Sequence, residues 1–331
     1  MLLIAFGTRP EYIKIKPLLK VFKKNGFNKY KTLFTGQHKE IIGKDIEFDY
    51  KIEIQTGSNR LDSIFSSILN REDFFEGITH VMIQGDTASA YAVSLAAFHR
   101  NVPVIHLEAG LRTYDIQNPY PEEYYRRCIS NLASINLCVS EFNKENLAIE
   151  KTPGNSFVVG NTVLDNLRDI QIKYTNKVLV TLHRRENHDL IEEWFKEIDS
   201  IAATYPGYEF ILPIHPNPNV KKHSGMLKNV KVIEPLEHID LVNLLAECAY
   251  VITDSGGIQE ESAFLKKKSI VCRKSTERIE GLNIFSFLCP EPSRLKYMVE
   301  SVILSEKINY ACPYGDGFSS EKIYEIIRTI I

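Results

Sequence analysis

Short apolar runs alternate with amphipathic segments along most of this 331-residue chain, and this alternation constrains the fold more than any other feature. Because the runs are apolar on both faces, they predict parallel sheets that helices cover on each side. Helical patterns between them include residues 88–100 and 191–205. The expected strands are residues 2–6, 31–35, 80–84, 102–108, 135–139, 157–160, 177–182, 208–215, 230–235, 250–254 and 268–272.

The length of the chain and a break in the alternation predict two domains. A polar stretch, DIQIKYTNK at 169–177, separates the two sets of strands. We therefore expect an α/β protein with two Rossmann-like, doubly wound parallel-sheet domains, over residues 1–170 and 171–315. Open α/β sheets bind ligands at the carboxyl ends of their strands, so the sequence predicts a central cleft faced by those ends.

Composition excludes several classes of function. A net charge of −2 gives no general attraction to nucleic acid or to an anionic membrane. No run approaches the roughly 20 apolar residues of a membrane span, and the N-terminus lacks a signal-peptide pattern, so we expect a cytoplasmic protein. The six cysteines are scattered without a C-x-x-C pair, which predicts reduced, buried thiols. No metal-ligand spacing and no G-x-G-x-x-G after the first strand occur, so no metal and no cofactor is expected.

The segment FGTRPEYIK follows the first expected strand and predicts an anion pocket. Thr8 and Glu11 fit a capping box, which starts a helix directly after the strand. The helix N-terminus and the cations of Arg9 and Lys14 suit a pyrophosphate. A capped helix with solvated cations is the alternative, and for Arg9 the two interpretations stay equally open.

The segment VITDSGGIQEE repeats this arrangement in the second half of the chain. Ser255 at the cap and Gly256 after it allow a phosphate to approach the backbone. Glu260 and Glu261 lie in the first helical turn, where one acid satisfies the helix dipole. The second acid is more than capping needs, and we predict that it accepts hydrogen bonds from a ribose diol.

Acid and base side chains gather at the ends of other expected strands. Asp86, Glu108 and Glu122 follow strands of the first half, and His183 and His215 end strands of the second half. An acid at the end of an apolar strand is costly unless it is paired or used. The cluster therefore predicts acid–base chemistry.

Each of these side chains, taken alone, also has a structural explanation. Asp86 fits a helix cap, and His215 fits a core histidine. Glu123, next to Glu122, fits a surface ion pair with Arg126 or Arg127. The cluster as a whole, and no single member, carries the prediction of catalysis.

Ordered motifs across nearly the whole chain resemble the non-hydrolysing UDP-N-acetylglucosamine 2-epimerase family. These are FGTRPEYIKIKPL, TGQH, GDT, HLEAGLRT, PEE, VGNTVLDNL, HRREN, PIHPNP, TDSGGIQEE, TER and CPYGDG. The resemblance implies a glycosyltransferase-B-like fold, a C-terminal helix (316–331) that returns to the first domain, and a homodimer. It also implies that UDP is eliminated from UDP-GlcNAc to give a 2-acetamidoglucal, and then re-added to give UDP-ManNAc.

The resemblance assigns roles to residues at matching positions. Asp86, Glu108 and Glu122 are implied as the acid–base set, with His183 as a phosphate-side or proton-handling group. The implied substrate contacts are Arg9, Lys14, His215, Ser255, Gly256, Glu261 and Arg112. The implied partner is a UDP-sugar, with neither nucleic acid nor membrane.

Departures from the family pattern keep other functions open. Gln37 and His38 match a second, regulatory nucleotide-sugar site, but Ser67 stands where we place that site's arginine. Tyr125 replaces a usual asparagine, and TERIEG replaces TERPE. The alternatives are a 2-epimerase of another UDP-2-acetamido sugar, a hydrolysing 2-epimerase, a retaining glycosyltransferase and a non-enzymatic nucleotide-sugar sensor. The three carboxylates favour the epimerase.

Overall fold

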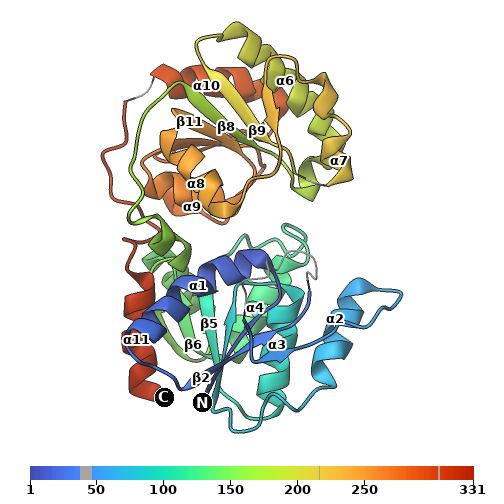
Figure 1. Ribbon diagram of the computed structural model, residues 1–331, viewed down its shortest axis with the longest axis vertical. Coiled ribbons are helices and arrows are strands. Elements are labelled where there is room, and N and C mark those ends of the chain that lie inside the picture. Colours follow the sequence, from blue (N-terminus) through green and yellow to red (C-terminus); the bar gives the residue numbers. More distant parts are fainter. Residues whose placement is uncertain (38–46, 216, 305) are drawn as a thin grey trace. The chain divides into compact units, whose positions relative to one another are not determined.

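A computed structural model describes residues 1–37, 47–215, 217–304 and 306–331 (Figure 1). The chain divides into two compact units. Unit 1 comprises Met1–Asn166 and Gly315–Ile331, and unit 2 comprises Leu167–Tyr314. The boundaries expected from the sequence, after residues 170 and 315, lie close to these positions.

Unit 1 contains a parallel sheet with the strand order β3-β2-β1-β4-β5-β6-β7. The order reverses beside β1, as in doubly wound folds. Its strands are β1 (Leu2–Phe6), β2 (Tyr30–Phe34), β3 (Tyr50–Lys51), β4 (His80–Gln84), β5 (Val104–Ala109), β6 (Ala133–Cys138) and β7 (Asn155–Val158). Its helices are α1 (Arg9–Lys24), α2 (Arg60–Leu69), α3 (Ala88–His99), α4 (Glu122–Leu132), α5 (Glu141–Ile149) and α11 (Ser319–Ile330), and the 3₁₀ helix η1 (Thr162–Leu167) ends at the boundary.

Alternate side chains of β1 face opposite layers of helices. Leu3 and Ala5 belong to a core cluster with residues of α2, α3 and α4, whereas Leu2, Ile4 and Phe6 belong to a cluster with residues of α1 and α11. This follows from the two-residue period of a strand, and it explains why β1 is apolar at every position. The ends of the strands, where polar residues begin, are therefore fixed in place by packing on both faces.

Unit 2 contains a second parallel sheet, with the order β10-β9-β8-β11-β12-β13. Its strands are β8 (Lys177–Thr181), β9 (Glu209–Pro213), β10 (Lys231–Ile233), β11 (Tyr250–Thr253), β12 (Lys268–Val271) and β13 (Ser286–Leu288). Its helices are α6 (Ile191–Thr204), α7 (Pro218–Lys221), α8 (His238–Glu247), α9 (Gly256–Phe264) and α10 (Leu295–Leu304), with 3₁₀ turns η2 (Arg185–Leu190), η3 (Ser224–Met226), η4 (Ile279–Gly281) and η5 (Pro292–Arg294).

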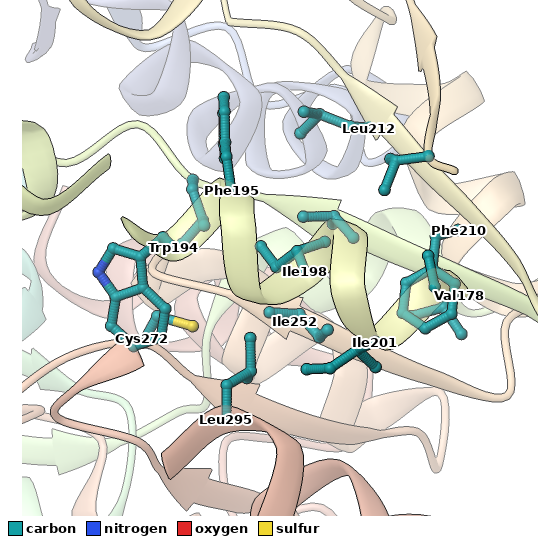
Figure 2. Packing of buried hydrophobic residues seen from close by; sticks show 14 of the residues in the cluster. Val178, Trp194, Phe195, Ile198, Ile201, Phe210, Leu212, Ile252, Cys272 and Leu295 are labelled. Carbon is teal, nitrogen blue, oxygen red and sulfur yellow. The ribbon is translucent and has the colours of Figure 1, made fainter. Parts of the chain in front are cut away.

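The core of unit 2 lies between α6 and this sheet. Figure 2 shows Trp194 and Ile198 of α6 among Val178, Ile252 and Leu295 of the cluster. The hydrophobic residues of α6 recur at helical spacing, so one face of the helix is buried along its length. This packing holds the ends of β8, β9 and β11, where the polar residues of unit 2 begin.

The structure confirms the predicted fold class of two doubly wound parallel-sheet domains. Each strand expected from the sequence is present, and β3 and β13, which are short strands at sheet edges, were not predicted. Four cysteines are buried thiols, as expected: Cys138, Cys248, Cys272 and Cys289. Within the described ranges, no helix has the length and hydrophobicity that crossing a bilayer requires.

The C-terminal helix α11 belongs to unit 1, although unit 2 separates it from the rest of that unit in the sequence. Tyr324 of α11 packs against Phe22 of α1, with ring centroids 6.0 Å apart. Asp165 of η1 caps the helix from a distance in sequence, because its carboxylate accepts hydrogen bonds from the amides of Ser319 (3.0 Å) and Ser320 (2.7 Å). These contacts fix α11 beside α1 (Figure 1).

Candidate functional site

The helix start that follows β1 has the predicted capping box. Thr8 Oγ1 accepts a hydrogen bond from the amide of Glu11 at 3.4 Å, and the Glu11 carboxylate accepts from the amides of Thr8 (3.1 Å) and Gly7. Two amides expected to bind a phosphate are thus occupied within the protein. The phosphate role predicted for this turn rests instead on Arg9, whose side chain is half-buried.

Glu11 is a buried acid that the sequence marked only as a cap. The residue is 3% exposed, and its Oε2 accepts both backbone amides of the capping box. Burial raises the pKa of Glu11 to about 7, although the amides of Gly7 and Thr8 oppose this shift. The group therefore exchanges a proton near neutral pH.

Glu108 lies at an irregular position near the end of β5. Its φ is +68°, and the register between β5 and β6 shifts between Leu107 and Ala109. A non-glycine residue in the left-handed region costs free energy, and such positions concentrate at functional sites. The irregularity re-aims the side chain of Glu108 relative to its neighbours in the strand.

Three donors from separate segments meet the Glu108 carboxylate. Lys14 of α1 and Gln84 at the end of β4 both donate to Oε2, and Asn161, after β7, donates to Oε1 at 3.2 Å. The side chains of Glu108 and Lys14 are 5% and 16% exposed. Charge-assisted hydrogen bonds in such a setting hold a carboxylate ionised and in one orientation.

Asp86 and Glu122 are connected through α4. Arg126 donates through Nε to Asp86 Oδ2 at 2.8 Å, with a second bond from Nη2. Glu122, half-buried, begins α4 and lies one helical turn before Arg126, so the two share a face of the helix. The structure thus places Asp86, Glu108 and Glu122 in one unit, each at a strand end or in the helix start that follows.

Glu123 has a structural position. It is fully buried, and its two carboxylate oxygens accept from the amides of Thr113 and Tyr114, both at 3.1 Å. Its Oε2 also lies 3.3 Å from Arg126 Nη1, which is the predicted ion pair. The pair is buried, however, and does not lie on the surface as the sequence suggested. Glu123 therefore orders the loop before α4.

His106 on β5 is a buried histidine to which sequence reasoning gave no role. Its Nε2 lies 2.9 Å from the carbonyl oxygen of Gly85, which fixes the proton on that nitrogen. Burial, as the largest cause, lowers the pKa of His106 to about 4, so the ring is neutral above that pH. The sequence signal for His106 is its position two residues before Glu108 in the motif HLEAG.

Arg112 supports the fold. Its Nε and Nη2 donate to the two carboxylate oxygens of Glu150 at 2.9 and 2.8 Å, and Nη2 also donates to Ser130. The side chain has no exposed surface. These bonds hold Nε and Nη2 within the protein, and the contact of Arg112 with substrate stays a prediction.

In unit 2, Asp254 organises the turn that carries His183. Its buried carboxylate accepts from the amides of His183 (3.0 Å) and Arg184 (2.9 Å), and from Asn187 Nδ2 (3.0 Å). The sequence showed Asp254 only as the end of a strand. The three donors from residues 183–187 explain why an acid occupies that position.

His183 and His215 come together as the sequence predicted for strand ends. Their rings stack with centroids 4.9 Å apart and planes 12° apart. Desolvation is the largest cause that lowers the pKa of both rings. Arg184 also lowers the pKa of His183, His183 lowers that of His215, and Asp254 opposes both shifts. Both histidines are therefore neutral near pH 7, and each can donate one hydrogen bond and accept another.

The start of α9 differs in one respect from the prediction. Ser255 caps the helix by accepting from the amide of Ile258 at 3.5 Å. A Cβ on Gly256 would lie 2.8 Å from Arg278 Nη1, so an arginine of the same unit approaches this glycine. A Cβ on Gly257 would meet no atom within 4 Å, so the second glycine faces open space.

The two adjacent acids of α9 have different partners. Glu260 is fully buried and accepts from Arg278 Nε at 2.8 Å. Glu261 is 3% exposed, and one of its oxygens lies 2.7 Å from His238 Nε2. Glu260 is thus part of an internal ion pair, which leaves Glu261 as the candidate for the predicted ribose contact.

The segment expected to regulate the enzyme contains an arginine that we did not anticipate. Arg60, the first residue of α2, donates to the carbonyl oxygen of Gln37 at 2.9 Å. Ser67 is buried and accepts from the amide of Gln55. His38 lies outside the described residues. Arg60 thus bonds to this segment, whereas Ser67 bonds within the fold.

Across residues 1–37, 47–215, 217–304 and 306–331, no group of three or more His, Cys, Asp or Glu side chains is arranged to hold a metal ion. The chemical groups at hand are carboxylates, neutral imidazoles, amides and cations.

The sequence is similar to those of known proteins of one family. The family model described as UDP-N-acetylglucosamine 2-epimerase matches residues 20–328. A UDP-N-acetylglucosamine 2-epimerase of Salmonella borreze is 35% identical, over 98% of this chain and 97% of that protein. One from Bacillus subtilis is also 35% identical, over 97% and 93%.

Solved structures give the same result. The crystal structure of UDP-GlcNAc 2-epimerase from Neisseria meningitidis bound to UDP-GlcNAc has a TM-score of 0.89 and 33% identity, and covers 99% of both chains. MurG of Acinetobacter baumannii, at 12% identity and a TM-score of 0.62, is similar in fold alone, which agrees with a glycosyltransferase-B-like fold. By the family model and by these relatives, the chain belongs to the UDP-N-acetylglucosamine 2-epimerase family.

Proposed function

We propose that this chain interconverts UDP-N-acetylglucosamine and UDP-N-acetylmannosamine without hydrolysing them. One observation carries the proposal. Glu108, in a left-handed backbone conformation, is bonded to Lys14 and to two amides, while Asp86 in the same unit is bonded to Arg126. Carboxylates paired with cations at strand ends, one buried and one half-buried, suit proton transfer at a carbon next to a leaving group.

The proposed reaction is an elimination followed by its reversal on the other face. A carboxylate removes the proton from C2, the C1–O bond breaks, and UDP departs with the electron pair to give a 2-acetamidoglucal. UDP then adds back to C1 while a proton is delivered to the opposite face of C2. Two faces require more than one acid–base group, and Asp86, Glu108 and Glu122 are the candidates.

Cations and neutral hydrogen-bond donors are proposed to stabilise the leaving group. Within unit 1, Arg9 is suited to a developing negative charge, and within unit 2 the same holds for His183, His215 and the Ser255 turn. Glu261 is the candidate for the ribose. Relatives titled as bound to UDP-GlcNAc or to UDP support a UDP-sugar as the ligand. A cytoplasmic homodimer, as the resemblance and composition suggest, completes the proposal.

Proton NMR in heavy water tests the reaction directly. Purified protein with UDP-N-acetylglucosamine is expected to place deuterium at C2 and to produce a UDP-N-acetylmannosamine signal. Release of free N-acetylmannosamine with UDP would instead identify a hydrolysing enzyme. Binding without exchange would favour a sensor or a transferase. UDP-glucose, which lacks the acetamido group, serves as the control substrate.

A further inference from the structure

We propose that Gln84 and Asn161 are positioning residues for Glu108, which they hold ionised and in one orientation. The inference rests on the proposed function, in which Glu108 exchanges a proton with the substrate. Both side chains lie outside the set of candidate residues drawn from the sequence. They reach the carboxylate from two segments, at the end of β4 and after β7.

The burial of these side chains shows that their bonds to Glu108 are exchanged little for water. Gln84, Asn161 and Glu108 are 3%, 2% and 7% exposed. Gln84 Nε2 donates to Oε2, the oxygen that Lys14 also contacts, and Asn161 Nδ2 donates to Oε1. Each oxygen of the Glu108 carboxylate is therefore bonded by an amide from a different segment: Oε2 by the end of β4, and Oε1 by the segment after β7.

The orientation of Asn161 is itself fixed. Its Oδ1 accepts from the amide of Val163 at 3.1 Å, so its NH₂ group, and not its oxygen, faces Glu108. An amide NH₂ group only donates, and a protonated carboxyl oxygen offers a hydrogen where the donor needs a lone pair. The two amides consequently favour the carboxylate over the carboxylic acid.

The backbone conformation of Glu108 explains why its carboxylate needs several partners. Glu108 has a φ of +68° at the register shift of β5, so its side chain leaves the strand in an unusual direction. A strained residue persists when surrounding contacts over-determine it. Lys14, Gln84 and Asn161 supply those contacts, and loss of either amide is expected to loosen the carboxylate without touching a UDP contact.

The variants Gln84→Met and Asn161→Asp test the inference. Methionine keeps the approximate length of glutamine without a donor, and aspartate keeps the bond to the Val163 amide while losing the donor. We expect each to slow C2 deuterium exchange at saturating substrate by about tenfold or more. UDP affinity by calorimetry should stay within about threefold. Asn166→Asp is the matched control, because Asn166 lies nearby in η1 and donates to the carbonyl oxygen of Ile13; its exchange rate should change little.

A double-mutant cycle separates positioning from a merely structural role. If the two amides act through the carboxylate of Glu108, then adding either variant to Glu108→Gln lowers the residual exchange no further. Equal additional losses in that background, or a parallel loss of UDP affinity, would overturn the inference. If one variant fails to fold by its thermal transition, the other still carries the test.

The same variants test the proposed role of Glu108 and the positioning role of the two amides separately. Normal exchange by Glu108→Gln would overturn the proposed role of Glu108 itself. Loss of exchange by Glu108→Gln, with normal exchange by both Gln84→Met and Asn161→Asp, would leave the function standing and overturn the positioning role.

Discussion

Lys14 forms an ion pair with Glu108, and both side chains are largely withdrawn from water. The sequence placed Lys14 beside Arg9 as part of a diphosphate clamp. The structure instead directs its charge to a carboxylate that we assign to proton transfer. Removing one member of a buried pair leaves the other charge uncompensated, so the two cations of this helix start should behave differently.

Lys14→Met is therefore expected to affect chemistry more than binding. Without the ammonium group, Glu108 is less readily kept ionised, and C2 exchange should fall by about 10- to 100-fold. UDP affinity should change by less than about threefold. Calorimetry and NMR exchange on one preparation measure both quantities. A loss confined to UDP affinity would return Lys14 to the diphosphate.

Arg9→Ala should show the opposite behaviour. It removes a charge-assisted contact to the diphosphate, so UDP binding should weaken by about 1.5–3 kcal/mol, which is roughly ten- to a hundredfold. Lys16→Ala is the control, because Lys16 is an exposed cation on the same helix. Equal affinities of the Arg9 and Lys16 variants for UDP would contradict the assignment.

Asp86→Asn and Glu122→Gln keep the shape of each side chain and remove its base. Each should lower turnover by about 10²-fold or more while leaving UDP affinity nearly unchanged. Glu123→Gln is the contrasting variant, since Glu123 binds the amides of Thr113 and Tyr114. It should lower the melting temperature more than either of the others. Near-normal exchange in the Asp86 and Glu122 variants would make those acids structural.

The ends of strands were the part of the site that sequence alone made visible. Asp86, Glu108 and His183 were found because a polar residue after an apolar run is conspicuous. The partners were not visible. Gln84 and Asn161 look like ordinary polar residues until parallel pairing brings their segments to Glu108. The left-handed backbone of Glu108 leaves no mark in composition or periodicity.

Two predicted substrate contacts have neighbours within the protein that the sequence did not reveal. The resemblance assigns Arg112 to the substrate, and the structure shows that Arg112 also bonds to Glu150, 38 residues later in the sequence. Gly256 was assigned to a ligand, but the group that approaches it is Arg278. A local pattern shows that a small residue or a charge is required, and only the tertiary fold shows what requires it.

Glu11→Gln should change how stability depends on pH. Below pH 4.5 the carboxyl group is protonated in the folded and unfolded states alike. As pH rises through 4.5 the unfolded chain loses its proton first, because burial raises the folded-state pKa to about 7. Stability therefore falls between pH 4.5 and about 7 and is constant above it.

Glutamine at position 11 does not ionise, so the variant does not lose stability in this way as pH rises. The variant should gain up to about 3 kcal/mol relative to the parent protein between pH 4 and pH 8. Urea unfolding at the two pH values measures the difference, in which the opposite effect of His106 cancels because both proteins contain it. A difference that is the same at both pH values would show that Glu11 ionises normally.

Asp165→Ala should destabilise unit 1 through α11. Asp165 accepts from the amides of Ser319 and Ser320, and loss of a capping carboxylate costs about 1–2 kcal/mol. Urea unfolding measures the change. Asp316→Ala is the control, because Asp316 at the same end of α11 is exposed, pairs with Lys322 and accepts from the amide of Phe318, which precedes the helix. Equal effects of the two variants would mean that the cap is unimportant.

The discontinuity of unit 1 sets the order in which a nascent chain acquires its structure. The ribosome makes β1 to β7 first, then all of unit 2, and only then α11, whose Ile323 and Ile327 close the cluster that contains Ile15, Leu18 and Phe22. Until then, α1 packs against the sheet, but the face of α1 that α11 covers stays exposed. For the time that translation needs to produce about 150 further residues, at roughly 5–20 per second, this face is open to chaperones and to other nascent chains.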